Sequence, residues 1–430
     1  MTFKSKKQGT RANRTSRKMT PGAEQKSPAS DTVKRFPYWA LVVPGTFMMA
    51  WGGNHFTPLL HMYQELGDYA RWQVNLLLGM YVFGLVPGLM MAANLSDRHG
   101  RKIAFIGGLL TTIVGNLILA LSLESFTLMC IGRVIAGVGV GVAMSVGTTW
   151  VKELSCPPFD MKAGVAEGAR RPSLTLTLGF AIGAAVSGIC AQYIQFPHLV
   201  PYFVLITITA LCIPAALAAP ETRGRVKESN SLWKAFHVPS ALDKRFTRVL
   251  LPAAPWAFAA AGVAYAVIPS SEENELGDST TIYATVLTVL TLGTGAVIQG
   301  VAMRIDRACG GRGLQLSLLV MTVGMALAAV ATWWKNPWLG VFVAMLLGSA
   351  FGLSVICGLG QVQRIATPDN LSALTGAYYA VAYTGFLLPT VLAALLPVAP
   401  YPVSLSVVTG ICALCLVLSH RAMRTQRGRA

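Results

Sequence analysis

Residues 72–102 read WQVNLLLGMYVFGLVPGLMMAANLSDRHGRK, and this stretch decides the class of the fold. From residue 72 to residue 96 there is no Asp, Glu, Lys or Arg, whereas four of the next six residues are charged. A transmembrane helix needs about 20 apolar residues to cross a hydrocarbon core of about 30 Å. The stretch therefore predicts a membrane-spanning helix that ends in a short charged loop.

The same alternation of apolar runs and charged loops continues along the 430 residues. The charge-free stretches are 36–64, 72–96, 103–123, 134–151, 172–220, 249–271, 279–303, 313–334, 336–363 and 370–420. Two of them are of double length and contain prolines near the middle, so we expect twelve spans. Only 12% of the residues are charged, against about 25% in a soluble protein, which excludes a soluble domain and intrinsic disorder. The predicted fold class is an all-α membrane protein.

The positions of the basic residues predict how the chain is oriented. The net charge is +17, yet all but three of the 35 lysines and arginines lie in the tails and in alternate loops. Loops rich in Lys and Arg stay in the cytoplasm, so we expect both termini there, in a plasma membrane or bacterial inner membrane. The tail 1–36 could also be read as a nucleic-acid arm or a transit peptide. We expect a solvated tail beside anionic lipid, and no nucleic-acid partner.

The two halves of the chain repeat each other. Asp97 and Arg98 follow span two as Asp306 and Arg307 follow span eight. Two six-helix bundles of one orientation form the architecture in which halves rock around a central site. We expect a cytoplasmic tail at 1–36, a first six-helix bundle at 37–219 and a cytoplasmic linker at 220–247. A second six-helix bundle at 248–419 and a cytoplasmic tail at 420–430 complete the chain.

The charged loop after span two carries the most specific motif. Asp97, Arg98, Gly100, Arg101 and Lys102 match the loop signature G-x-x-x-D-R-x-G-R-K/R, with Asn94 in place of the first glycine. In this motif the chain resembles the major facilitator superfamily. The resemblance implies a twelve-span transporter in which this loop acts as a conformational gate.

Two further helices are similar to superfamily patterns. Span four contains an arginine and glycines of the form R-x-x-x-G-x-G-x-G, and span five resembles the antiporter signature of drug exporters, with Ala184 in place of its proline. The glycines expected at helix contacts are Gly137, Gly141, Gly179, Gly183 and Gly188. Arg133 is the one ionised residue deep inside a predicted span, where burial costs at least about 2.5 kcal/mol. That cost indicates a role in a cavity, with snorkelling to the outer surface as the alternative.

Other candidate residues are polar groups in apolar spans. No carboxylate lies inside a span, so His55, beside Asn54, is the titratable group best placed for proton coupling, unless it is only a hydrogen-bonded cavity residue. Glu153 and Arg170 resemble the acidic and basic partners at the inner gate of superfamily members. The tyrosines that could contact substrate are Tyr81, Tyr265, Tyr378, Tyr379 and Tyr383. For each, ordinary helix packing is the alternative.

No catalytic constellation, metal-ligand cluster or phosphate-binding loop is recognisable, so we expect no enzyme, no cofactor and no metal. The predicted function is secondary transport of a small organic molecule by alternating access, as a monomer, with proton-coupled efflux expected. Import or facilitated transport of an organic anion is the alternative, because Arg133 has no acidic partner inside a span and the proline of the antiporter signature is missing.

Overall fold

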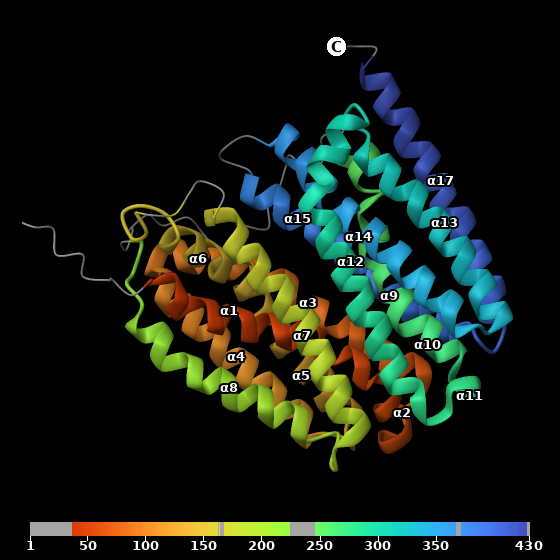
Figure 1. The fold of residues 1–430 in the computed structure, drawn as a ribbon, viewed down its shortest axis with the longest axis horizontal. Coiled ribbons are helices and arrows are strands. Elements are labelled where there is room, and N and C mark those ends of the chain that lie inside the picture. Colours follow the sequence, from red (N-terminus) through yellow and green to blue (C-terminus); the bar gives the residue numbers. More distant parts are fainter. Residues whose placement is uncertain (1–36, 162, 164–166, 224–245, 367–370, 428–430) are drawn as a thin grey trace, which may run out of the picture. The chain divides into compact units, whose positions relative to one another are not determined.

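The computed structural model describes residues 37–161, 163, 167–223, 246–366 and 371–427, and within these ranges all regular structure is helical. The basic tail at 1–36 and most of the predicted linker at 220–247 lie outside the described residues. Residues 37–430 belong to one compact unit. Figure 1 shows the first half in red to yellow-green and the second half in green to blue.

In the described residues of the first half there are eight α-helices and two short segments of other helix types. Its elements are α1 (Trp39–Asn54), the 3₁₀ turn η1 (Thr57–Leu59), α2 (Leu60–Gly67), α3 (Arg71–His99), α4 (Arg101–Leu121), α5 (Phe126–Val142), the π segment η2 (Ala143–Gly147), α6 (Thr148–Leu154), α7 (Glu167–Tyr193) and α8 (Val200–Ala218). Because α5, η2 and α6 form one continuous span, they extend the predicted fourth span by one turn, to Leu154.

The second half repeats this plan with more interruptions. Its elements are η5 (Phe246–Leu250), α9 (Ala254–Gly262), η6 (Val263–Val267), α10 (Ile268–Ser271), α11 (Glu273–Leu276), η7 (Gly277–Ser279), α12 (Thr280–Ala308), α13 (Gly313–Trp334), α14 (Pro337–Ile365), α15 (Leu371–Tyr383), η8 (Thr384–Leu387), α16 (Leu388–Ala394) and α17 (Tyr401–Arg427). The path through η5, α9, η6 and α10 forms the seventh predicted span, and α15, η8 and α16 form the eleventh.

Among the described residues, eleven helical segments are long and apolar enough to cross a membrane. The first of the twelve predicted spans is missing from this set because α1 has only 16 residues. The chain nevertheless continues through η1, where Pro58 stands at the start of the turn, into α2. A proline cannot donate the backbone hydrogen bond that a continuous helix needs there. The predicted all-helical membrane fold is confirmed, with its first span broken.

Glycines allow the spans to approach closely within each half. Gly84 and Gly88 on α3 face Val134 and Val138 on α5, so that backbone lies against backbone. The second half has the same contact between α12 and α14, where Gly352 lies against Gly295. Gly293 stands 209 residues after Gly84 but faces open space. The repeat is therefore shifted by two residues at this contact.

The two halves meet mainly along two pairs of spans, and η1 and α2 also contact α12. Helix α3 contacts α15, η8 and α16, and α7 contacts α12. On α12 the hydroxyls of Thr285, Thr288 and Thr291 each donate to the backbone carbonyl four residues earlier, at 2.7 Å. Gly188 of α7 lies directly against the Thr285 side chain. The polar face of α12 is therefore satisfied within its own helix, and no hydroxyl of these three bonds across the seam.

Candidate functional site

A central cavity of about 610 Å³ lies between the two halves. This volume is within the range of small-molecule sites, about 300–1,000 Å³. It extends from Asn54 and Tyr81 to the end of the bundle that carries Lys152. That end, with the junctions 98–102, 152–161, 167–171 and 304–312, is called the basic end below. The opposite end, with the segment 272–278, is called the acidic end.

The lining combines aromatic rings, hydroxyls and amides. The first half supplies Asn54, Tyr81, Met144, Thr148, Thr149, Lys152, Gly168, Pro172, Ser173, Leu176, Thr177 and Phe180. The second half supplies Phe258, Leu292, Gln299, Phe351, Val355, Ile356, Leu359, Gln363, Tyr379 and Tyr383. Lys152 is the one cationic side chain in this described set, and no carboxylate belongs to it. A molecule with a negative charge and a flat apolar body fits such a lining.

Three of the five candidate tyrosines line this cavity. Tyr383 stacks on Phe258 with ring centroids 4.0 Å apart, and Tyr81 meets Tyr383 edge to face at 6.2 Å. Tyr379 is the third lining ring. The other two point elsewhere. The Tyr378 hydroxyl donates to the carbonyl oxygen of Ser354 at 3.2 Å, and the Tyr265 ring lies beside Phe386.

Arg133 lies behind the cavity wall and is 1% exposed. Its guanidinium lies over the rings of Phe56 and Tyr81, at 4.4 and 5.0 Å from their centroids. Its Nε donates to the carbonyl oxygen of Leu77 at 3.0 Å, and Nη2 has no hydrogen-bond partner among the described residues. Since Tyr81 stands between Arg133 and the cavity, the arginine does not itself line the space.

His55 and its neighbours form a buried polar cluster beside Arg133. The His55 Nδ1 accepts a hydrogen bond from Trp51 Nε1 at 3.0 Å, which leaves Nε2 without a partner in the described chain. The His55 ring contacts Tyr202, whose hydroxyl is 2.6 Å from that of Tyr63. Asn54 lines the cavity, but its neighbour His55 points into this cluster.

At the acidic end, hydrogen bonds and ion pairs join the two halves. Glu273 is 2.7 Å from Nη2 of Arg71 and 3.4 Å from Nδ1 of His61. Gln192 of α7 donates to the carbonyl oxygen of Asp278 and accepts from the backbone N–H of Ile282. The halves are therefore locked together at this end, while the cavity extends toward the basic end.

Next to this lock, Glu272 is completely buried. Neither of its carboxyl oxygens has a hydrogen-bond partner among the described residues. Burial raises the pKa of Glu272 to about 7, although the nearby Tyr283 hydroxyl partly opposes the shift. That hydroxyl donates instead to the carbonyl oxygen of Pro337 at 2.8 Å, so it does not satisfy the carboxylate.

At the basic end, Arg101 is the centre of the predicted gate. Its guanidinium holds both oxygens of Glu153, at 2.8 and 3.2 Å, and Oδ1 of Asp97 at 2.9 Å. Arg223 also approaches Asp97, at 3.2 Å. Except for Arg223, which follows α8, these residues belong to the first half, so the network ties α3, α4 and α6 to the segment after α8. Arg170, expected near Glu153, is exposed, and the cation that Glu153 binds is Arg101.

Gly100 and Glu221 shape the turn at the centre of this network. Gly100 has φ +98°, and a Cβ there would lie 2.6 Å from Glu221 Oε2, so only glycine fits. Glu221 accepts hydrogen bonds from the backbone N–H groups of Arg101 and Lys102, at 2.8 and 3.0 Å. Partial burial acts to raise the pKa of Glu221, but the backbone donors outweigh it and the pKa is lowered. The carboxylate therefore caps the N-terminus of α4.

Arg98 and Lys102 of the same motif differ in their surroundings. The Lys102 ammonium donates to the carbonyl oxygen of Leu217 at 2.7 Å, which links α4 to α8. Arg98 lies near the end of α3, and its Nη2 is buried without a hydrogen-bond partner in the described residues. The motif residues are thus brought together at one helix junction.

The five glycines expected at helix contacts lie against neighbouring helices. Gly137 and Gly141 of α5 lie against the backbone of α3, and Gly179 and Gly183 of α7 lie against the backbone of α1. Gly188 lies against α12 of the other half. Gly385 repeats the Gly179 contact in the second half, against Pro255 of α9. The antiporter-like pattern of span five is thus used for close packing in this conformation.

Several lining residues were not predicted from the sequence. Lys152 directly follows the charge-free stretch 134–151, a position that predicts a loop residue, yet α6 continues beyond it and places it in the cavity. Gln299 and Gln363 are amides at the ends of apolar spans, which is a signal that could have identified them. The rings of Phe258 and Phe351 carry no such signal, because phenylalanine is also common on lipid-facing surfaces.

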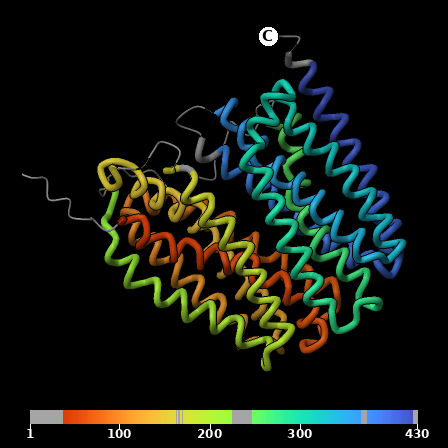
Figure 2. Tube along the Cα trace, in the orientation of Figure 1, coloured from red at the N-terminus to blue at the C-terminus, as the bar shows by residue number. Residues whose placement is uncertain are grey.

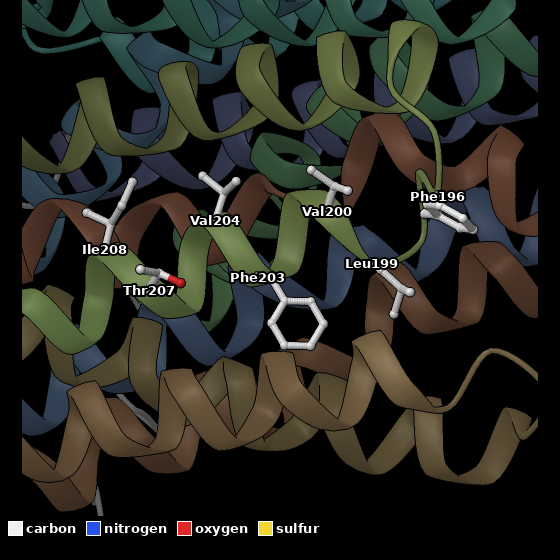
Figure 3. A pocket seen from close by; sticks show the side chains of 7 residues that line it. All are labelled: Phe196, Leu199, Val200, Phe203, Val204, Thr207 and Ile208. Atoms are coloured by element: carbon white, nitrogen blue, oxygen red, sulfur yellow. The ribbon is translucent and has the colours of Figure 1, made fainter.

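A second hollow, of about 490 Å³, lies on α8 and has a different character. Figure 3 shows Val200, Val204 and Ile208 projecting from one side of this helix and Phe203 from another. Thr207 supplies the one hydroxyl of the lining. An almost wholly apolar surface of this kind suits contact with lipid tails, and it offers no group that would orient a polar substrate.

Two bundles of membrane-spanning helices surround a central cavity and are joined at one end, which is the architecture in which two halves rock around a central site. The family comparison agrees with this architecture. The model of the Major Facilitator Superfamily matches residues 42–390, and the chain belongs to this superfamily. It is an integral, multi-pass membrane protein.

Relatives of known name share only part of their sequence with the chain. A 3-(3-hydroxy-phenyl)propionate transporter of Escherichia coli is 31% identical over 117 residues, which cover 26% of this chain and 28% of the relative. The high-affinity fructose transporter ght6 of Schizosaccharomyces pombe is 28% identical over 131 residues, which cover 30% of this chain and 24% of the relative. The chain thus matches about a quarter of the length of these relatives.

Solved structures match almost the whole chain at low sequence identity. A mutant form of the nucleoside transporter NupG aligns with a TM-score of 0.70 at 11% identity, covering 90% of this chain and 100% of that one. The human organic anion transporter MFSD10 aligns with a TM-score of 0.62 at 18% identity, covering 89% and 99%. These likenesses support the fold and leave the substrate open.

Proposed function

We propose that this protein transports a small organic anion with a flat, apolar body, which binds in the central cavity. The observation that carries the proposal is the lining, where Lys152 is accompanied by aromatic rings and by no carboxylate among the described residues. Arg133, buried behind Tyr81, adds positive potential from the far side of the wall. Lys152 is exposed and Arg133 is buried, and together they make the potential in the cavity positive, which favours an anionic ligand.

The relatives support this substrate class. One of them is named for 3-(3-hydroxy-phenyl)propionate, which is an aromatic carboxylate, and one fold neighbour is named as an organic anion transporter. Other relatives are named for sugars, which carry no charge. A neutral sugar gives Lys152 no counter-ion, so the charge of the lining favours the carboxylate.

We further propose that transport occurs by alternating access and that the conformation described here faces the cytoplasm. The ion pair between Arg71 and Glu273 closes the acidic end, and the cavity reaches the basic end. The excess of Lys and Arg at the basic end supports its cytoplasmic location, with both termini on that side of the plasma membrane or bacterial inner membrane. The protein is proposed to act as a monomer.

The direct test is binding and uptake in proteoliposomes with a panel of aromatic carboxylates and their uncharged amides. We expect the carboxylates alone to compete, and Lys152→Gln to weaken their binding by up to about five-fold, as for the loss of one exposed charge pair. The control is Arg304→Gln, which removes the same charge from an exposed position at the basic end. Equal binding of acid and amide by the unmodified protein would contradict the proposal.

A second candidate function is proton-coupled efflux, which specifies the direction of transport and the coupling ion. The glycine pattern of span five, with Gly179, Gly183 and Gly188, supports it through its likeness to antiporters. Here His55 would carry the proton, since no carboxylate lines the cavity in the described residues. An imposed pH gradient distinguishes a proton antiporter from an anion–proton symporter. A gradient that is acid inside the proteoliposomes drives substrate accumulation by an antiporter and opposes accumulation by a symporter. Loss of gradient dependence in His55→Gln would support His55 as the proton site.

A further inference from the structure

A groove of about 610 Å³ lies between the start of α13 and the end of α17, at the basic end and outside the central cavity. The two helices pack side by side over most of their length (Figures 1 and 2). Its rim is cationic, with Arg312 before α13 and His420, Arg421 and Arg424 on the last turns of α17. Among the described residues no carboxylate lines it. Because none of its residues belongs to the central cavity, the groove needs another explanation than substrate binding.

The floor of the groove is apolar and lies deeper in the span than the rim. Leu316 and Leu319 follow Arg312 by one and two turns of α13, and Leu416 and Val417 precede Arg424 by about two turns of α17. Seven residues of α-helix correspond to about 10 Å along the axis. The groove therefore runs from a charged rim at the membrane surface into the hydrocarbon region. Leu319 is 49% exposed and Val417 is 44% exposed in the described structure, so both are open to an acyl chain.

A buried amide lies between the rim and the floor. Gln315 lines the groove and is 5% exposed, and its Nε2 donates to Ser419 Oγ at 3.2 Å. Its Oε1 has no hydrogen-bond partner in the described residues. A buried carbonyl oxygen without a hydrogen-bond donor destabilises the folded protein. A ligand hydroxyl at this level would satisfy it.

We propose that this groove binds an anionic glycerophospholipid of the phosphatidylglycerol type. The phosphate lies between Arg312 and Arg424, a headgroup hydroxyl donates to Gln315 Oε1, and one acyl chain covers the leucine floor. Basic pockets between spans on the cytoplasmic side recognise anionic headgroups in this way, at about 1 kcal/mol for each Lys or Arg. A free phosphate ion would leave the apolar floor uncovered, and a zwitterionic lipid would leave the cationic rim without a matching net charge.

The test is native mass spectrometry of the full chain, purified from equal amounts of phosphatidylglycerol and phosphatidylcholine with the same acyl chains. We expect retention of about one phosphatidylglycerol per chain in preference to phosphatidylcholine. The double variant Arg312→Gln/Arg424→Gln should weaken that binding roughly 10- to 30-fold. The matched control is Arg304→Gln/Arg307→Gln, which removes two exposed charges from the same end but outside the groove. The proposal is overturned if both double variants retain the lipid equally, or if the two lipids are retained equally.

A second pair of variants tests the acyl-chain floor and does not depend on the arginines. Leu319→Gln should weaken phosphatidylglycerol retention several-fold, whereas Leu110→Gln on α4 should not, although both leucines are 49% exposed. Thermal protection by glycerophosphoglycerol or inorganic phosphate equal to that by the intact lipid would overturn the lipid assignment in favour of a headgroup-only site. A dimer that dissociates in the Arg312→Gln/Arg424→Gln variant would overturn it in favour of a second copy of the chain.

Discussion

The contact between α3 and α5 makes a prediction about Gly141 that can be worked out from distances. A methyl group on Gly141 would lie 2.5 Å from the carbonyl oxygen of Leu85 and 2.5 Å from the backbone nitrogen of Leu89. Carbon and oxygen atoms in close helix contacts are about 3.3–3.6 Å apart. The carbonyl carbon of Gly88 lies 2.8 Å away, and because all three obstructing atoms belong to the backbone, no side-chain rotation relieves the overlap. Gly141→Ala must therefore push α5 away from α3 by about 1 Å, the difference between these distances.

Overpacking of this kind costs about 1–3 kcal/mol, and we expect the upper part of that range because three backbone atoms collide. In purified protein the melting temperature should fall by roughly 3–6 °C. The control is Gly107→Ala on α4, where a methyl group meets nothing within 4 Å. That change should stabilise the helix by about 0.5–1 kcal/mol. If Gly141→Ala melts at or above the temperature of Gly107→Ala, the close approach of α3 and α5 is incorrect.

Three further predictions concern the two ends of the bundle. Arg101→Gln should lower the free energy of unfolding by about 1–3 kcal/mol and reduce transport, because Glu153 loses its main partner. Asp97→Asn should reduce transport with a smaller loss of stability. Calorimetry measures the stability and uptake assays measure the transport, and unaffected transport in both variants would exclude a gating role. For Glu272, the folded carboxyl keeps its proton to a pKa of about 7, whereas an unfolded one releases it near about 4.3. Between those two pKa values the folded state binds more protons than the unfolded state. The free energy of unfolding should therefore fall as the pH rises from about 4.5 to 7, by at most about 1.4 kcal/mol per pH unit. Glu272→Gln should remove this pH dependence from the melting curves, and an unchanged pH dependence would assign it to another group. Glu273→Gln should shift the conformational equilibrium toward states open at the acidic end by up to about five-fold. Spin labels on α2 and α11 should then be farther apart. An unchanged distance distribution would show that the ion pair with Arg71 does not hold this end closed.

The sequence predicted the fold well because the signal in a membrane protein is local. The length of a charge-free run by itself indicates whether that segment can cross the membrane. The runs at 72–96 and 313–334, for example, correspond to α3 and α13. The break in the first span escaped that signal because residues 55–59 are as free of charge as their surroundings, and Pro58 was the remaining indication. The π segments at 143–147 and 263–267 have no counterpart in the sequence pattern.

The cavity was predicted only in part, for a physical reason. In a soluble helix the polar face marks the side that meets water, whereas in lipid both faces of a span are apolar. The sequence therefore could not separate Tyr81 and Tyr383, which line the cavity, from Tyr265 and Tyr378, which do not. The motif residues around Arg101 were easier to place, because charged groups at a span end gather at the same junction.

The threonines of α12 have a consequence for the kinetics of transport. Thr285, Thr288 and Thr291 keep their hydrogen bonds inside their own helix, and Gly188 leaves room for Thr285 to lie flush against α7. Separation of α7 from α12 at this level therefore breaks no hydrogen bond made by these hydroxyls. Apart from the two hydrogen bonds that Gln192 makes with Asp278 and Ile282 near the acidic end, the activation enthalpy of opening this seam should come from lost dispersion contacts and from the entry of water or lipid.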